Sequence, residues 1–146
     1  MNTETSGSFR GNKLWLQAVV GDKDWVLCHT SALECLELFV GYLNEERIDV
    51  YATELGEYEN VNYRIVESFD NLSIARFHNL RYTTVSQTIN DMLADFDSID
   101  EQPLVEALSN YYFMNGQSFD SLTILPENID RFNKIKDWAI EYYDEV

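Results

Sequence analysis

The chain has two histidines and two cysteines that could serve as bases, nucleophiles or soft metal ligands near neutral pH. Cys28 is adjacent to His29, whereas Cys35 and His78 lie further along the chain. A zinc site needs nitrogen and sulfur ligands at close, paired spacing, which this set does not supply. A Cys–His nucleophile pair is formally possible, but buried structural cysteines are the commoner case. We therefore expect no catalytic residue, metal or cofactor, and keep a small enzyme that uses Cys28, His29 or His78 as a lesser alternative.

Three aspartates, Asp95, Asp97 and Asp100, are spaced along one predicted connection. Spaced carboxylates can hold a hard cation, but the glycine and the terminal glutamate of a calcium loop are absent from this segment. We interpret it as a solvated loop in which Asp100 caps the helix that follows. The sequence also contains no glycine-rich phosphate loop and no Gly-x-Ser-x-Gly nucleophile elbow.

Charge is distributed very unevenly along the chain. Ten Lys and Arg oppose 26 Asp and Glu, which gives a formal net charge of −16. No Lys or Arg occurs from Tyr82 through Asp130. Such a field opposes direct binding to nucleic acid or to anionic lipid, and it speeds association with a basic protein.

A candidate partner-binding surface lies within this acidic stretch. Adjacent tyrosines cannot both face the core of one helix, and exposed tyrosine beside acids suits a protein interface. The residues that we assign to this surface are Asp91, Asp95, Asp97, Asp100, Glu101, Tyr111 and Tyr112.

The elements that position these residues must fit in 146 residues, of which 45% are hydrophobic. We expect residues 1–12 to form a flexible polar arm and residues 13–146 to form a single α+β domain. No apolar run approaches the roughly 20 residues that span a bilayer. Two cysteines make no disulfide framework, so we expect a cytoplasmic protein that is not bound to a membrane.

The first half of the chain is predicted to contain strands around one capped helix. Residues 13–20 and 25–28 read as short extended segments. Ser31 followed by Glu34 matches a capping box, and apolar spacing predicts a helix from there to about Leu43. Beyond it, apolar and polar residues alternate in four runs, which predict an antiparallel meander of three to four strands over residues 48–52, 61–66, 72–77 and 81–84.

The C-terminal half is predicted to be helical. Ser86 can cap a helix that runs to about Ala94, and Asp100 can cap a second helix that stops near Gly116. Pro126 opens a last helix with apolar residues at spacings of three or four. The order of elements is that of an α+β fold.

One stretch resembles a known family. Residues 25–38 (WVLCHTSALECLEL) resemble the Ser-Ala-Leu-x-x-x-x-Leu helix start of AbiEi-type abortive-infection antitoxins, with matches at Ser31, Ala32, Leu33 and Leu38. The strand runs and the segments 79–84 and 86–93 are similar to the later part of that family, so the likeness covers about residues 14–140. Residues 38–41 (LFVG) depart from the family's usual His-Gly, and twelve polar residues cannot form its N-terminal winged helix-turn-helix.

The resemblance implies a stand-alone, non-enzymatic antitoxin domain of a toxin–antitoxin or phage-defence system. Its partner would be a protein with a basic surface, a nucleotidyltransferase-like toxin, and it would not bind nucleic acid directly. The alternative is an acidic nucleic-acid mimic that inhibits a DNA- or RNA-binding enzyme. A mimic would be displaced from its target by DNA and would bind with a steep dependence on salt.

Overall fold

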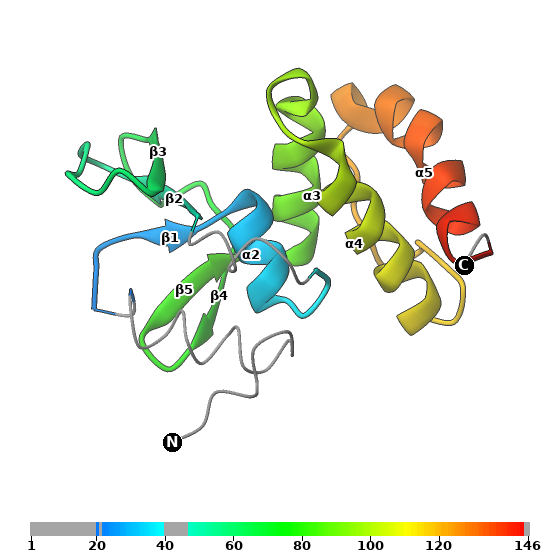
Figure 1. Ribbon diagram of the computed structural model, residues 1–146, viewed down its shortest axis with the longest axis horizontal. Helices are drawn as coiled ribbons and strands as arrows, with labels where there is room; N and C mark the ends of the chain where they lie inside the picture. Colours follow the sequence, from blue (N-terminus) through cyan, green and yellow to red (C-terminus); the bar gives the residue numbers. More distant parts are fainter. Residues whose placement is uncertain (1–19, 21, 40–46, 145–146) are drawn as a thin grey trace.

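A computed structural model describes residues 20, 22–39 and 47–144 of the chain. In Figure 1 a sheet lies to the left, helices α3, α4 and α5 lie to the right, and the short helix α2 lies between them. The elements in chain order are β1 (Val26–Leu27), α2 (His29–Cys35), β2 (Ile48–Ala52), β3 (Val61–Ile65), β4 (Ile74–Phe77), β5 (Leu80–Thr83), α3 (Val85–Ala94), η2 (Phe96–Ser98), α4 (Glu101–Met114), η3 (Pro126–Asn128) and α5 (Ile129–Asp144). The α+β class and the helical C-terminal half are confirmed. No helix in the described ranges has the length and apolarity needed to cross a membrane.

The sheet is mixed, so the prediction of an antiparallel meander is wrong. Its strand order is β3-β2-β1-β5-β4. The pairs β1–β2 and β4–β5 are antiparallel, whereas β2–β3 and β1–β5 are parallel. The strand positions themselves were predictable, because alternation of apolar residues reports which face of a strand is buried. Alternation carries no information about whether neighbouring strands run parallel or antiparallel. For β2 and β3, this depends on the path that residues 53–60 take between the two strands.

The predicted arm at residues 1–12 and most of the predicted segment 13–20 lie outside the described residues. Val20 is described and is buried against the sheet core. Residues 25–28 contain the central strand β1, which pairs with β2 on one side and β5 on the other.

Helix α2 is buried along its whole length and separates two apolar cores. Leu33 packs into the core of the helical half, and Ala32 and Cys35 pack into the core of the sheet. Because a central helix must bury every face, its polar residues need partners inside the protein.

The predicted capping box at the start of this helix is wrong. Helix α2 begins three residues earlier, at His29, with Cys28 rather than Ser31 at the N-cap position. The Ser31 hydroxyl instead accepts a hydrogen bond from the backbone N–H of Asp49 at 2.8 Å, which ties α2 to β2. The helix ends at Cys35, and residues 40–43 of the predicted helix lie outside the described residues.

Two other predicted caps have different outcomes. Asp100 is the N-cap of α4, and its Oδ1 accepts a hydrogen bond from the backbone N–H of Gln102 at 3.1 Å. Ser86 is not a cap, because α3 begins at Val85 after Thr84. The Ser86 hydroxyl accepts from the backbone N–H of Thr123 at 3.0 Å and so fixes the segment that leads to α5.

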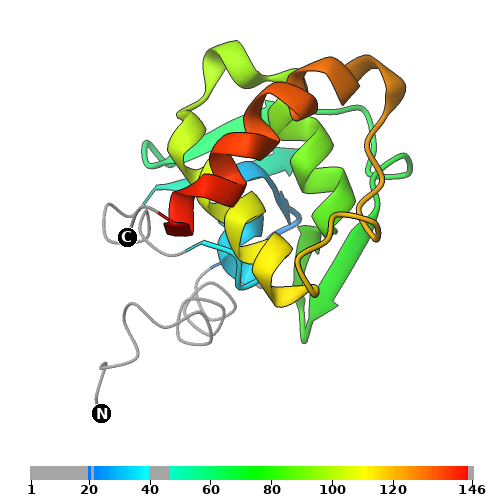
Figure 2. The same ribbon diagram turned by 90° about the vertical axis from the view of Figure 1, so that its right-hand side faces the viewer.

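The helical core holds α3, α4 and α5 together. Figure 2 shows α5 lying across α4, with the sheet behind the helices. The shared core includes Ile89, Met92, Leu93, Leu104, Leu108, Phe132, Ile135 and Ala139. Complete burial of such side chains contributes roughly 1.5–3 kcal/mol each, so this packing fixes where the C-terminal end of α3 lies relative to the sheet.

Candidate functional site

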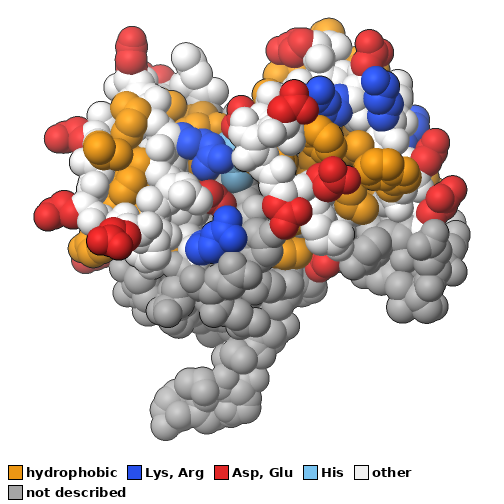
Figure 3. All heavy atoms as spheres, turned by 45° about the horizontal axis from the view of Figure 1, so that its top comes forward, with side chains coloured by type: hydrophobic (Ala, Val, Ile, Leu, Met, Phe, Trp, Pro, Cys, Tyr) orange, Lys and Arg blue, Asp and Glu red, His pale blue; other side chains and the backbone are white. Residues whose placement is uncertain are grey.

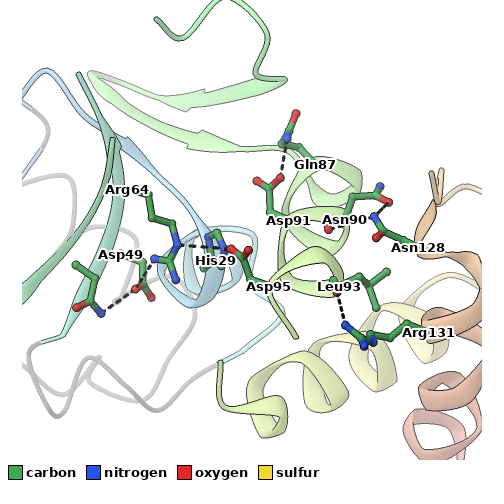
Figure 4. Close-up of polar contacts among 11 residues, drawn as sticks. His29, Asp49, Arg64, Gln87, Asn90, Asp91, Leu93, Asp95, Asn128 and Arg131 are labelled. Carbon is green, nitrogen blue, oxygen red and sulfur yellow. Dashed lines mark hydrogen bonds and ion pairs between the residues drawn. The ribbon is translucent and has the colours of Figure 1, made fainter. Parts of the chain in front are cut away.

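The residues predicted to bind a partner do not lie on one surface. Asp91 of α3 and Asp95, the residue that follows α3, point towards the sheet (Figure 4). Asp97, Asp100 and Glu101 are exposed around η2 and the start of α4.

The two predicted tyrosines are less exposed than Asp97, Asp100 and Glu101. Tyr111 is buried in the helical core, and its ring stacks on Phe119 with centroids 6.3 Å apart. Tyr112 is half-buried, so it is the member of the pair nearer the surface. Tyr111 therefore contributes to packing rather than to a surface.

One face of α3 carries a row of polar side chains, and this face is turned towards the sheet. Gln87 and Asp91 of α3 and Asp95, its C-cap residue, are spaced by four residues, so they lie on the same side of the helix. The Gln87 amide donates to Asp91 Oδ1 at 2.9 Å. Across from this row, Asp49 of β2 and Arg64 of β3 project from the same face of the parallel strand pair (Figure 4). The polar face of the amphipathic helix α3 therefore lies opposite the polar face of the strands β2 and β3.

His29 lies between these strands and α3 (Figure 4). We call the group His29, Asp49, Tyr51, Arg64, Asp91 and Asp95 the charged cluster. His29 Nε2 lies 2.7 Å from Asp95 Oδ2, and the His29 side chain is 2% exposed. An ionised carboxylate only accepts hydrogen bonds, so Nε2 carries the proton and Nδ1 carries the lone pair in the neutral ring. Nδ1 is buried and has no hydrogen-bond partner among the described residues. His29 also has a positive φ of 50°, a left-handed conformation that costs energy for a non-glycine residue.

Arg64 lies between the carboxylates of β2 and α3. Its Nη1 donates to Asp49 Oδ1 at 3.2 Å, and its Nε lies 3.7 Å from Asp95 Oδ2. Asn62 also donates to Asp49 Oδ1, at 3.0 Å. The register that pairs Asp49 with Asn62 places these side chains together.

Burial shifts the pKa values of the groups in this cluster. Desolvation, helped by the Arg64 charge, lowers the pKa of His29, although the Asp95 hydrogen bond opposes this shift. Desolvation raises the pKa of Asp91, although the nearby Tyr51 hydroxyl and the Gln87 amide favour its ionised form. Burial and the Asp91 charge raise the pKa of Tyr51. The neutral forms of His29 and Tyr51 therefore prevail at neutral pH.

The thiols and the second histidine do not join into a nucleophilic pair. Cys28 is fully buried, and this burial, with the nearby Asp49 charge, raises the pKa of its thiol well above the usual value. Cys35 is buried in the sheet core. His78 is exposed in the turn between β4 and β5 and lies against Phe77. Within the described ranges, no group of three or more His, Cys, Asp and Glu side chains is arranged to hold a metal ion.

A small pocket of about 100 Å³ opens beside His29. Figure 3 looks onto the hollow between the sheet and the helices, where acidic and basic side chains surround a histidine. We call this pocket the His29 pocket, and its walls are His29, Thr30, Arg47, Asp49, Asn62, Arg64, Ser98, Ile99 and Asp100. It is bounded by the start of α2, the strands β2 and β3, and the segment that leads into α4.

Sequence reasoning missed Asp49 and Arg64 as site residues and undervalued His29. The available signal was the placement of charged residues inside alternating strands, where Asp49 and Arg64 occupy the polar face. The partner of His29 could not be found in this way, because 66 residues separate it from Asp95.

Comparison of the chain with protein-family models and with curated proteins finds no match. The likeness to AbiEi-type antitoxins therefore stays a prediction that rests on the residues quoted above.

Proposed function

We propose that this chain is a non-enzymatic, antitoxin-like regulatory protein of the cytoplasm, which acts by binding a partner protein that has a basic surface. The observation that carries the proposal is a group of exposed carboxylates beside the His29 pocket, which we call the acidic rim: Asp97, Asp100 and Glu101. By its resemblance to the antitoxin family, the partner would be a nucleotidyltransferase-like toxin.

Two carboxylates of the acidic rim, Asp97 and Glu101, are exposed to a partner. The Asp97 side chain is 89% exposed, and Arg131 Nη2 lies 3.9 Å away, at the limit of an ion pair. Exposed pairs of this kind are worth about 0–1 kcal/mol, so Arg131 leaves the Asp97 charge largely uncompensated. Because the whole chain has a net charge of −16, its field and that of the rim would attract and orient a basic protein.

An exposed tryptophan on α5 supports a protein interface in the same region. Trp138 is 54% exposed and lies seven residues, or two helical turns, beyond Arg131. Arg131 contacts the segment at the end of α3 through Leu93 O and the Phe96 ring. Trp138 therefore shares the face of α5 that borders the rim, and tryptophan is enriched among the residues that dominate binding energy at interfaces.

Two observations favour binding over catalysis at the His29 pocket. The buried Cys28 thiol, whose pKa is raised, is a poor nucleophile at neutral pH. The His29 pocket, at about 100 Å³, is smaller than the roughly 300–1,000 Å³ of typical small-molecule sites.

The test is capture of a partner from a lysate of the native host by the immobilised chain. The double variant Asp97→Lys/Glu101→Lys reverses two rim charges and keeps the Asp100 cap. The matched control Glu54→Lys/Glu57→Lys makes the same charge change in the exposed segment after β2. We expect one protein to be retained by the wild type and the control and lost by the rim variant.

Equal retention by both variants would overturn the assignment of the rim. A nucleic-acid enzyme that DNA displaces from the wild type would instead establish the mimic. If the captured protein is toxic when expressed alone, co-expression of the wild type should restore growth, and the rim variant should not.

A further inference from the structure

We infer that the outer edge of β3 binds an extended apolar segment of another protein, which adds a strand to the sheet and carries basic residues at its two ends. β3 is the first strand in the order β3-β2-β1-β5-β4, and Figure 1 shows it at the left end of the sheet. This edge lies outside the acidic rim, so the inference goes beyond the proposed function and does not depend on it.

Two residues of β3, Tyr63 and Ile65, direct their backbone N–H and C=O groups away from the sheet. Just beyond the strand, the backbone N–H of Val66 donates to Ala52 O of β2 at 2.9 Å. Because successive residues of a strand alternate in direction, the even-numbered residues of β3 pair with β2 and the odd-numbered ones face outwards. Within the described residues, none of the backbone hydrogen bonds outside the helices and strand ladders involves Tyr63 or Ile65. Their N–H and C=O groups are therefore a template for a further strand.

An apolar pocket of about 150 Å³ lies at the start of this edge strand. We call it the β3 pocket, and its apolar walls include Trp25, Ile48, Tyr58 and Val61. Val61 and Tyr63 project from the same face of β3, and both pack on the core of the sheet. An apolar cavity of roughly 150 Å³ holds a molecule the size of benzene, so the β3 pocket accommodates an aliphatic side chain of an added strand.

Apolar surface continues along the same face of β3 beyond the pocket. Ile65 is 54% exposed and, by alternation, shares this face with Val61 at the other end of the strand. At the left of Figure 3, exposed hydrophobic side chains gather on the sheet and acidic side chains surround them. Alternate side chains of an added strand would meet the β3 pocket at one end and Ile65 at the other. Main-chain hydrogen bonds would then supply affinity, and these side chains would supply specificity.

Charge at the two ends of β3 selects a basic segment over a second copy of this chain. Glu59 precedes the strand and Glu67 follows it, and both are exposed without an ion pair among the described residues. Lys23, which also lines the pocket, lies over the Tyr58 ring, 5.6 Å from its centroid. Antiparallel pairing of two copies about Tyr63 would bring Glu59 of one copy towards Glu67 of the other, and opposed like charges destabilise a strand pair.

The test is an NMR titration of the intact chain, followed at the backbone amides of Tyr63 and Ile65. The probe is the peptide acetyl-Lys-Val-Thr-Val-Thr-Val-Lys-amide, in which the valines share one face. One control peptide has proline in place of the central valine, and another has glutamate in place of both lysines. We expect a saturable shift with the probe and at least fivefold weaker binding of each control peptide.

Variants of the chain separate the backbone from the charges. Ile65→Pro removes an outward N–H and no bond to β2, so it should weaken the probe at least tenfold, whereas Ile65→Thr, which keeps that N–H, should weaken it about threefold. Unchanged amide shifts in β1 and β5 verify that the proline variant is folded. Glu59→Gln/Glu67→Gln leaves the backbone intact and should weaken the probe at least threefold.

The absence of a saturable shift at Tyr63 and Ile65 would overturn the inference, and so would equal binding of the probe and the proline peptide. Shifts of these amides that grow with protein concentration, without peptide, would identify a second copy as the occupant and would also overturn it. None of these results bears on the acidic rim, whose variants are tested by capture of a partner.

Discussion

His29 combines a left-handed backbone, nearly complete burial and a hydrogen bond to Asp95. Because its pKa is lowered in the folded protein, the unfolded chain binds a proton more tightly than the native state does. The stability that the neutral ring contributes is therefore complete above the ordinary histidine pKa of about 6.5, and it is lost as the pH falls below that value.

We predict that the free energy of unfolding decreases between pH 7.5 and pH 5.5, with a slope from His29 of up to about 1.4 kcal/mol per pH unit. Urea denaturation at several pH values measures it, and His29→Gln should flatten the profile. Asp91, whose pKa is raised, acts with the opposite sign, since its contribution grows as the pH falls. The difference between the wild type and the variant isolates the histidine, and identical profiles would show that His29 is not the source.

The cysteines give a second prediction at this scale. Both thiols are buried, and burial raises the pKa of Cys28. A thiol reagent at pH 7 should therefore label neither residue quickly in the native protein and both after unfolding in urea. Rapid native labelling of Cys28 would restore the enzyme hypothesis, because a reactive cysteine must be accessible as a thiolate.

At the scale of elements, the caps and connections decide how the polar groups are placed. Asp100 caps α4 through the backbone N–H of Gln102, so Asp100→Ala should lower the free energy of unfolding by about 1 kcal/mol. Asp97→Ala, which removes a charge in the same segment but no cap, should change it by less than about 0.5 kcal/mol. Urea denaturation at neutral pH compares the two variants, and equal losses would contradict the assignment of the cap.

The elements also show how far the sequence could predict the fold. The helices α3, α4 and α5 were predictable because their apolar residues recur at helical spacing over ten or more residues. The start of α2 was not, because the Ser31 hydroxyl is used by Asp49, a residue 18 positions away. Local pattern cannot reveal a partner of that kind, nor the direction in which β3 pairs with β2.

Part of the candidate site could also be predicted from the sequence, and part could not. The exposure of Asp97, Asp100 and Glu101 follows from their place in a polar connection. The inward orientation of Asp91 and Asp95 depends on the helical core, which turns that face of α3 towards the sheet. Both the buried position of Tyr111 and the meeting of His29 with Asp95 result from packing between distant segments.

At the scale of the whole molecule, both apolar cores include residues of α2. Their packing places the polar face of the sheet against the polar face of α3. The charged cluster forms at that contact, and the acidic rim borders it on the outside. The net charge of −16 then sets the kind of partner that approaches. Association with a basic protein should accordingly weaken as salt increases, because screening shortens the reach of exposed charges to about 8 Å at physiological ionic strength.

The most direct test of the central claim is the affinity of the captured partner for three purified chains, measured by calorimetry at physiological salt. We predict that Asp97→Lys/Glu101→Lys weakens binding at least tenfold relative to the wild type. The control Glu54→Lys/Glu57→Lys, which has the same net charge as the rim variant, should stay within about threefold, a loss that long-range electrostatics accounts for. Equal losses in the two variants would contradict the account, because binding would then follow the net charge of the chain rather than the acidic rim.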